Sequence, residues 1–344
     1  LPRLGYFATA FFTGCMNVTA AALIIFRYAK RLHRPKLYKA AVSGLLFLMV
    51  LGMLFSDTIS GQVEDGLYRD RVILSEHTKY QHIVMTKHKD DLRLYLDGNV
   101  QFCSLDEYRY HEALVHIPMA QAPSRDKVLV LGGGDGLALR ELLKYPETEI
   151  TLVDLDEQMV QLCTEDPQIA ALNEGALESD RVTVICQDAY QYLTETEERY
   201  DVILVDLPDP NNESLNKLYT NIFYRLCFRA LTDEGIMSVQ STSPYYATKA
   251  YWCIGETLKS EGFYVKPYHL QVPSFGDWGF QLASKQPLEG GLEISVPTRY
   301  LTEENADNLF VFGKDELPEE KPEINALSKP VLMEYYSEAV RNWE

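Results

Sequence analysis

The sequence predicts an α/β fold whose main part is a doubly wound parallel sheet, because two patterns point to it. Between residues 127 and 285, apolar runs alternate with stretches of helical periodicity. Such runs are typical of strands that are buried on both faces of a parallel sheet. A glycine-rich loop, residues 132–136, follows the first run and opens a helix, so we expect a ligand at the carboxyl ends of the strands. The runs are KVLVLGG, EITLVDLD, VTVICQD, YDVILVDLPDP and GIMSVQS.

Two apolar segments stand at the start of the chain. Leu4–Phe26 has 23 residues without a charged side chain, and Ala40–Ser56 has 17. A membrane-spanning helix needs about 20 apolar residues, so we expect membrane helices here. The second segment is short enough to be re-entrant or interfacial, and each segment could instead be a buried helix of a soluble protein. The chain begins at Leu1 rather than Met, so we expect it to be part of a longer protein.

The loop between these segments is basic and gives a conflicting topology signal. Lysines and arginines are frequent in residues 27–39, and the positive-inside rule places such a loop in the cytoplasm. If the second segment spans the membrane, everything after residue 60 then lies outside. We nevertheless expect a cell-membrane protein with a cytoplasmic catalytic domain, and the sequence leaves the conflict open.

The remaining segments predict a small β domain before the main sheet and an extension after it. YQHIVMTK and LRLYLDGNVQF are short strand-like runs, with a turn signal at Asp97-Gly98. DEYRYHEALVHIPM then predicts a helix that ends at Pro118 and Pro123. A last helix is expected over residues 330–343. The predicted parts are 1–60 (hydrophobic segments), 61–122 (β domain and helix), 123–285 (Rossmann-like catalytic domain) and 286–344 (extension).

Composition excludes some classes of function. The chain has 32 Lys and Arg against 50 Asp and Glu, a net charge of −18. That balance argues against nucleic-acid binding, which needs basic surface. It suits a cationic small molecule, although solubility alone also accounts for it. The six cysteines form no CxxC pair and the seven histidines no HExxH motif, so we expect reduced thiols and no metal.

Acidic residues recur where the predicted strands end. Any one of them could be a helix cap or a turn residue. Four successive strand ends with an acid favour a shared crevice instead, because the carboxyl ends of parallel strands converge. The acids are Asp135, Asp154, Asp156, Asp188, Asp206 and Asp209.

The spacing of the first acids favours a nucleoside that carries a positive charge. Asp154 lies 20 residues after Gly134, where an acid can accept hydrogen bonds from ribose hydroxyls. GGGDG is not the dinucleotide pattern GxGxxG, and Asp135 would face a pyrophosphate. An S-adenosyl sulfonium compound removes that difficulty, since Asp135 can pair with an amine on it. Asp188 would suit the adenine amino group.

The last two acids suit proton transfer from an amine. An alkyl ammonium must lose a proton before it attacks a sulfonium compound, and a nearby carboxylate can accept that proton. Asp206 is the candidate base, and Asp209 could hold a second ammonium or orient the first. Two nearby carboxylates also disfavour each other's charge, which raises a pKa and improves a base.

Seven motifs, in this order from about residue 70 to 285, resemble the spermidine synthase family, the polyamine aminopropyltransferases. The resemblance implies a Rossmann-like domain of the class I methyltransferase type, transfer of an aminopropyl group from decarboxylated S-adenosylmethionine to putrescine, no permanently bound cofactor and a homodimer. The hydrophobic start and the tail resemble a bacterial branch fused behind membrane helices. The motifs are YQHI, LYLDGNVQF, DEYRYHEALVH, VLVLGGGDG, VDLD, QDAY and VDLPDP.

The resemblance also implies residue roles. On the donor side, Asp135 pairs with the free amine that decarboxylation leaves, and Asp154 and Asp188 hold ribose and adenine. On the acceptor side, Asp206 is the base and Tyr110 orients the attacking nitrogen. The further implied donor-side positions are Gln81, His111, Gly132, Gly134 and Pro210, and the further amine-side positions are Asp209, Gln240 and Phe275.

Two departures from the family pattern concern the acceptor. The family often has Asp-Ser-Ser-Asp-Pro where this chain has DLPDP, so Leu207 and Pro208 remove two hydroxyls. Phe275 stands where many members have a tyrosine. Trp278 and Phe280 could reshape the acceptor end, and Trp278 could equally be a core residue. Agmatine, cadaverine or spermidine therefore stay open as acceptors. A methyltransferase activity and a non-catalytic role as a polyamine sensor also stay open, because one fold can carry several functions.

Overall fold

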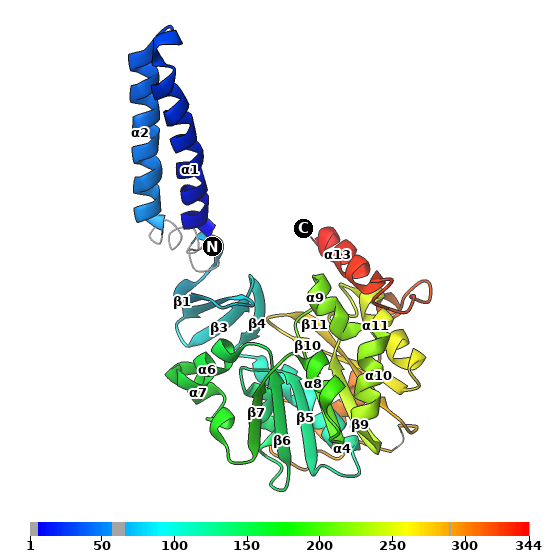
Figure 1. The fold of residues 1–344 in the computed structure, drawn as a ribbon. Coiled ribbons are helices and arrows are strands. Elements are labelled where there is room, and N and C mark those ends of the chain that lie inside the picture. The colour runs from blue at the N-terminus through cyan, green and yellow to red at the C-terminus, as the bar shows by residue number, and fades with distance from the viewer. Residues whose placement is uncertain (1–5, 57–65, 289, 344) are drawn as a thin grey trace. The chain divides into compact units, whose positions relative to one another are not determined.

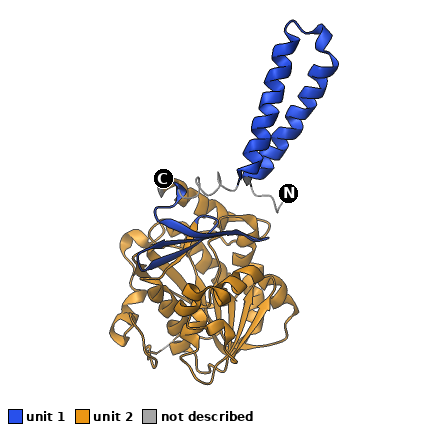
Figure 2. Ribbon diagram, turned by 90° about the vertical axis from the view of Figure 1, so that its left-hand side faces the viewer, with its two compact units in different colours: residues 1–98 blue, residues 99–344 orange. Residues whose placement is uncertain are grey.

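The structure is a computed structural model that describes residues 6–56, 66–288 and 290–343. The predicted boundary at residue 60 and the start of the segment Leu4–Phe26 lie outside the described residues. The chain divides into two compact units, residues 1–98 and 99–344 (Figure 2). The four-part division predicted from the sequence stays a prediction.

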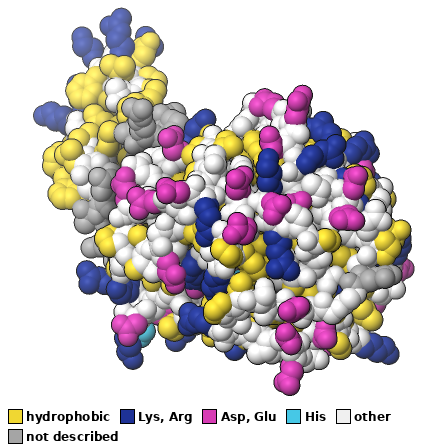
Figure 3. Space-filling model, turned by 90° about the horizontal axis from the view of Figure 1, so that it is seen from below, with side chains coloured by type: hydrophobic (Ala, Val, Ile, Leu, Met, Phe, Trp, Pro, Cys, Tyr) yellow, Lys and Arg dark blue, Asp and Glu magenta, His cyan; other side chains and the backbone are white. Residues whose placement is uncertain are grey.

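Unit 1 begins with a pair of apolar helices, α1 (Tyr6–Arg27) and α2 (Pro35–Leu54), which lie side by side (Figure 1). Both are long and apolar enough to cross a membrane. Their side chains are mostly exposed, and Figure 3 shows hydrophobic side chains along the pair. In water such surface is costly, so lipid is a natural environment for it, although two such helices alone are weak support for a membrane span.

The rest of unit 1 is antiparallel β structure. Strands β1 (Arg71–His77), β2 (His82–His88) and β3 (Asp91–Leu96) pair in sequence order. Asp97 and Gly98 both have positive φ, as a tight turn requires, so the turn stands where the sequence indicated it.

Unit 2 opens with β4 (Asn99–Cys103) and the buried helix α4 (Glu107–Gln121). Of the two prolines predicted to end this helix, Pro118 lies inside it, and the helix ends at Gln121, two residues before Pro123. Proline removes one backbone donor and is costly mainly in a helix interior. Pro118 lies inside α4, where residues 110–119 are all buried, and this packing outweighs the lost donor; its own carbonyl accepts a hydrogen bond from Ala122 N at 3.0 Å.

The main sheet of unit 2 has seven strands in the order β10-β11-β9-β8-β5-β6-β7. Five are parallel, as predicted, while β10 and β11 form an antiparallel hairpin that the sequence analysis did not separate. The predicted fold class is confirmed, with this correction for one edge. The strands are β5 (Lys127–Gly132), β6 (Glu149–Asp154), β7 (Val182–Cys186), β8 (Tyr200–Asp206), β9 (Leu231–Gln240), β10 (Tyr264–Val272) and β11 (Gly276–Ser284).

Helices pack against the main sheet of unit 2. A large apolar core joins β5, β8 and β9 to helices α8, α10, α11 and the C-terminal helix α13, and α4 packs against β9 and β10. The helices are α5 (Leu137–Leu142), α6 (Glu157–Glu165), α7 (Pro167–Leu172), α8 (Ala189–Glu195), α9 (Glu213–Asn216), α10 (Asn221–Ala230), α11 (Thr248–Ser260), α12 (Glu303–Ala306) and α13 (Val331–Trp343), with 3₁₀ turns η1 (Ala29–Arg31), η2 (Ala176–Glu178), η3 (Lys217–Tyr219), η4 (Asp307–Phe310) and η5 (Lys314–Glu316).

Candidate active site

The glycine loop after β5 runs directly against the end of β8. Gly132 is the register partner of Asp206. A Cβ at Gly132 would lie 2.1 Å from the Asp206 carbonyl oxygen, and φ at Gly132 is +81°. Only glycine meets both demands without strain. The loop and the end of β8 are therefore locked together, which fixes where the Asp206 side chain begins.

Asp154, at the end of β6, is held by backbone donors. Its Oδ2 accepts a hydrogen bond from Gly134 N at 3.1 Å, and its Oδ1 accepts one from Asp156 N at 2.9 Å. A Cβ at Gly134 would lie 2.8 Å from Asp154 Oδ2. The glycine therefore lets the loop approach the acid. Asp156 caps α6 through Gln158 N, which is the structural role that the sequence left open for it.

Asp135 is a buried carboxylate inside the loop. Its Oδ1 accepts a hydrogen bond from Leu137 N at 2.9 Å. Burial, and then the charge of Asp206, raise the pKa of Asp135 to about 6 against the opposing charge of His111. A buried acid with one backbone partner favours a cationic ligand over an anionic one.

Tyr110 and Asp206 are joined by a short hydrogen bond. The Tyr110 hydroxyl donates to Asp206 Oδ1 at 2.5 Å. Burial, followed by the charge of Asp206, raises the pKa of Tyr110 well above its usual range, so the tyrosine stays a donor. Burial also raises the pKa of Asp206, against the charge of His111 and the hydrogen bond from Tyr110. A carboxylate with a raised pKa is a better proton acceptor.

His111 is charged by a buried network that sequence reasoning missed. Its Nδ1 lies 2.9 Å from Glu107 Oε2, and Glu107 accepts a bidentate pair of hydrogen bonds from Arg140 at 2.9 and 3.0 Å. Although burial opposes it, Glu107 raises the pKa of His111 to about 9, with help from Asp135 and Asp206. The i,i+4 spacing of Glu107 and His111 was the available signal. The imidazolium partly balances the two carboxylates.

Asp188 differs from Asp135, Asp154, Asp206 and Asp209 in the direction of its pKa shift, which is downward where theirs is upward. Its Oδ1 caps α8 by accepting from Tyr190 N at 2.8 Å, and its Oδ2 accepts from Lys217 Nζ at 2.5 Å. Although burial raises it, Lys217 lowers the pKa of Asp188 overall. Asp188 therefore both caps α8 and forms a partly exposed ion pair with Lys217.

Asp209, three residues after β8, is held by side chains from distant segments. Gln240 Nε2 donates to Asp209 Oδ1 at 3.0 Å, and the Tyr336 hydroxyl of α13 donates to Oδ2 at 2.9 Å. Burial raises the pKa of Asp209 to about 6, and the hydrogen bonds from Tyr336, Gln240 and Thr242 oppose the rise. Tyr336 had no signal in the sequence, because it lies 127 residues away.

The comparisons with known proteins agree on one family. Residues 107–290 match the family model described as the spermine/spermidine synthase domain. A polyamine aminopropyltransferase of Oceanobacillus iheyensis is 44% identical over 99% of this chain and 68% of the relative, and one of Leptospira interrogans is 41% identical over 99% and 68%. This chain belongs to the polyamine aminopropyltransferase family.

Solved structures show the same relation. A spermidine synthase in complex with the transition state analogue AdoDATO has a TM-score of 0.67 and 26% identity, over 72% of this chain and 88% of that one. The spermidine synthase of Thermotoga maritima has a TM-score of 0.65 and 27% identity, over 72% and 87%. As a member of this family of transferases, the chain is an enzyme, as the sequence predicted.

Every predicted site residue except Gln81 belongs to unit 2. Pro210 is buried beside Asp209 in the chain, and the Phe275 ring packs edge-on to Tyr110 at 6.1 Å and next to Trp278 at 5.2 Å. Gln81 belongs to unit 1, just before β2, so its predicted place in the donor pocket stays a prediction.

The sequence predicts no metal, but one group of side chains among the described residues has the composition of a metal site. His269, Asp277 and Glu316 bring three potential ligand atoms together. His269 Nδ1 lies 2.8 Å from Asp277 Oδ1, and its Nε2 lies 2.8 Å from the Val311 carbonyl oxygen. Although burial lowers it, Asp277 and Val311 raise the pKa of His269 overall. These contacts describe a hydrogen-bonded ion pair, and we propose no metal here.

Proposed function

We propose that this aminopropyltransferase moves the aminopropyl group of decarboxylated S-adenosylmethionine to putrescine, giving spermidine and methylthioadenosine, with Asp206 as the general base. The observation that carries the proposal is the Tyr110–Asp206 hydrogen bond of 2.5 Å at the end of β8, next to the glycine loop. A positioned acid with a raised pKa is what removal of a proton from an alkyl ammonium needs.

The proposed step balances without any further reactant. Asp206 takes one proton from the acceptor ammonium and frees a nitrogen lone pair. The nitrogen then attacks the carbon of the aminopropyl group that is bonded to sulfur. The carbon–sulfur bond breaks, and its electrons return to sulfur, which leaves as the neutral thioether methylthioadenosine.

The donor is supported by Asp135. Decarboxylated S-adenosylmethionine carries a free amine and no carboxylate, and a buried acid in the loop suits that amine. Asp154 faces the same loop, with its position set by Gly134. We assign Asp154 to the ribose and Asp188 to the adenine, and place Gln81, His111 and Pro210 around them, as the family resemblance implies.

The assignment of a diamine acceptor is supported by Asp209, whose Oδ1 accepts a hydrogen bond from Gln240 Nε2 at 3.0 Å. A carboxylate here can hold the distal ammonium of a diamine while the near nitrogen reacts at Asp206. Phe275 has no hydroxyl and Leu207 and Pro208 have none either. Binding of the acceptor therefore depends on Asp206 and Asp209. Agmatine, cadaverine and spermidine are the acceptors to compare with putrescine.

Product analysis tests the proposal. The protein is incubated with decarboxylated S-adenosylmethionine and, separately, with S-adenosylmethionine, each against this panel of amines, and methylthioadenosine release is followed. We expect release from the decarboxylated donor alone, fastest with putrescine. Faster release with another amine would replace the acceptor, and methyl transfer from the intact donor would reject the donor assignment.

We further propose that α1 and α2 attach the enzyme to the cell membrane with unit 2 in the cytoplasm, and that the enzyme is a homodimer. The support is the apolar surface of both helices and the family resemblance. The basic loop at residues 27–39 gives the opposite topology signal, so labelling of the exposed Cys186 in intact cells is the decisive measurement. Labelling by a membrane-impermeant reagent would place unit 2 outside.

A further inference from the structure

The C-terminal helix α13 brings a hydroxyl to the amine side of the site from outside the matched family domain. The family model covers residues 107–290, and α13 spans Val331–Trp343. Its Tyr336 hydroxyl donates to Asp209 Oδ2 at 2.9 Å, while Gln240 Nε2 donates to Oδ1 at 3.0 Å. Each oxygen of this acid thus accepts a hydrogen bond from a neutral donor, which leaves the negative charge of the carboxylate in place.

Helix α13 is packed against the core of unit 2, which fixes the position of Tyr336. Val331 and Leu332 are buried in the core of unit 2. Asn325, fully buried just before the helix, donates to Asn216 Oδ1 at 3.1 Å and to the Tyr219 carbonyl oxygen at 3.0 Å. It therefore ties the C-terminal segment to the stretch that follows Asp209.

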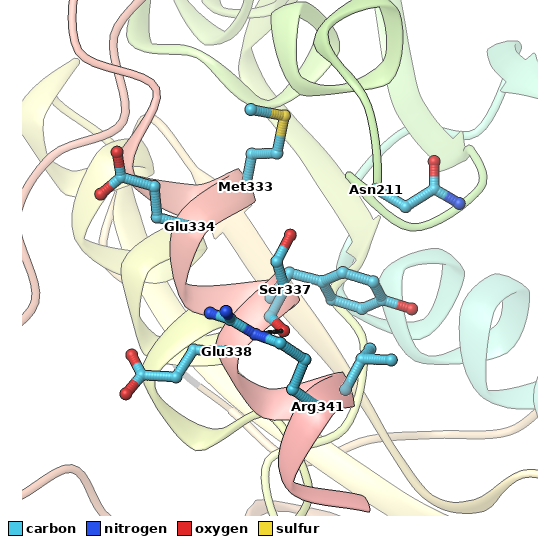
Figure 4. Close-up of a pocket in the computed structure, with 8 residues that line it drawn as sticks. Asn211, Met333, Glu334, Ser337, Glu338 and Arg341 are labelled. Carbon is cyan, nitrogen blue, oxygen red and sulfur yellow. Dashed lines mark hydrogen bonds between the residues drawn. The ribbon is translucent and has the colours of Figure 1, made fainter. Parts of the chain in front are cut away.

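An open pocket of about 710 Å³ is lined by α13 and by Asn211 of the loop that contains Asp209. Figure 4 shows Glu334, Ser337 and Arg341 along the helix and Asn211 on the facing loop. Tyr336 thus borders this pocket and also donates a hydrogen bond to Asp209.

We propose that Tyr336 is a positioning residue for the acceptor amine, acting by orienting the Asp209 carboxylate. The proposal rests on the proposed function, because it needs Asp209 to hold an ammonium of the acceptor. Tyr336 adds a donor that orders the acid without neutralising it, so the acid stays able to pair with a cation.

Tyr336→Phe is the direct test, because it removes the hydroxyl and keeps the ring. We expect the KM for the acceptor to rise about tenfold, the size of one hydrogen bond to a charged group, while the affinity for methylthioadenosine is unchanged. Tyr335→Phe is the matched control, since the Tyr335 ring lies 4.2 Å from Lys249 Nζ and has no bond to Asp209.

The pH profile separates positioning from simple packing. The hydrogen bond from Tyr336 lowers the pKa of Asp209, so the acidic limb of kcat/KM for the acceptor should move to higher pH in Tyr336→Phe. The other titratable groups near this acid are Tyr219 and, beyond it, Asp206, and both stay in place. A variant with reduced folding alone would lose kcat without moving this limb.

Each result bears on one claim. A raised acceptor KM and a shifted acidic limb in Tyr336→Phe, with neither in Tyr335→Phe, support the inference. Wild-type transfer to a diamine together with an unchanged Tyr336→Phe variant overturns the inference and leaves the proposed function standing. No transfer by the wild-type chain to any amine overturns both.

Discussion

The proposed nucleoside side and the proposed amine side of this site are assembled differently. Asp135 and Asp154 accept hydrogen bonds from backbone N–H groups that lie 2 to 20 residues away in the chain. Asp206 and Asp209 accept theirs from side chains that lie 31 to 127 residues away. The first pair is set by the shape of two loops, and the second depends on how α4, β9 and α13 pack around β8.

That difference teaches where substrate choice can change. A loop that is held by close backbone contacts tolerates little variation in sequence. At Gly132, for example, a Cβ would lie 2.1 Å from the Asp206 carbonyl oxygen. Side chains on separate elements can be exchanged one at a time. The donor is therefore expected to be fixed in this chain, whereas the acceptor is open to tuning by single residues.

The largest effect should come from Asp206→Asn. Loss of the general base should lower kcat by about 10²- to 10⁴-fold, because the acceptor then stays an ammonium. Methylthioadenosine should still bind, since its contacts lie on the other side. Turnover assays and calorimetric titration check this together. A parallel loss of donor affinity would break the separation of the two sides.

Asp135→Asn should instead weaken binding of the donor. We expect the affinity for decarboxylated S-adenosylmethionine to fall about 10- to 100-fold, as for a lost buried partner of a charged group. Methylthioadenosine has no amine and should bind nearly as before. Titration with both ligands measures the ratio. Equal losses for the two ligands would mean that Asp135 shapes the loop and does not read the amine.

The sequence indicates the surroundings of Asp135 and Asp154 more completely than those of Asp209, for a physical reason. The strand ends, the glycines and Asp135 are local patterns, so their spacing carries the information. Tyr336 reaches Asp209 only through packing of a helix whose own sequence shows no sign of it. Pro118 shows the reverse case, because its local signal predicted a helix end that the buried surroundings of α4 override.

The pKa of Asp135 gives a pH dependence of stability. Its pKa is about 6 in the folded chain against an ordinary value of 3.8, so the folded state binds more protons between these values. This stabilisation is complete below about pH 4 and is lost as the pH rises through about 6, with a size of about 3 kcal/mol.

Asp135→Asn should flatten that pH dependence. Thermal unfolding from pH 4 to 8 should show a smaller decline in the variant than in the wild-type chain, and Asp180→Asn, at an exposed position, is the control. A decline in stability of the same size in Asp135→Asn and in the wild-type chain would show that folding does not raise the pKa of Asp135.

The smallest effect should come from Lys217→Met. Lys217 donates to Asp188 at 2.5 Å, but its side chain is 35% exposed, and exposed ion pairs contribute about 0–1 kcal/mol. Because Tyr190 N holds Asp188 Oδ1 independently, the acid should keep its place when the lysine is gone. Donor affinity should then change less than about fivefold, as titration with methylthioadenosine can measure. A large loss would make Lys217 part of the nucleoside site, which would then also depend on a side chain 29 residues away, and the contrast between the two sides would weaken.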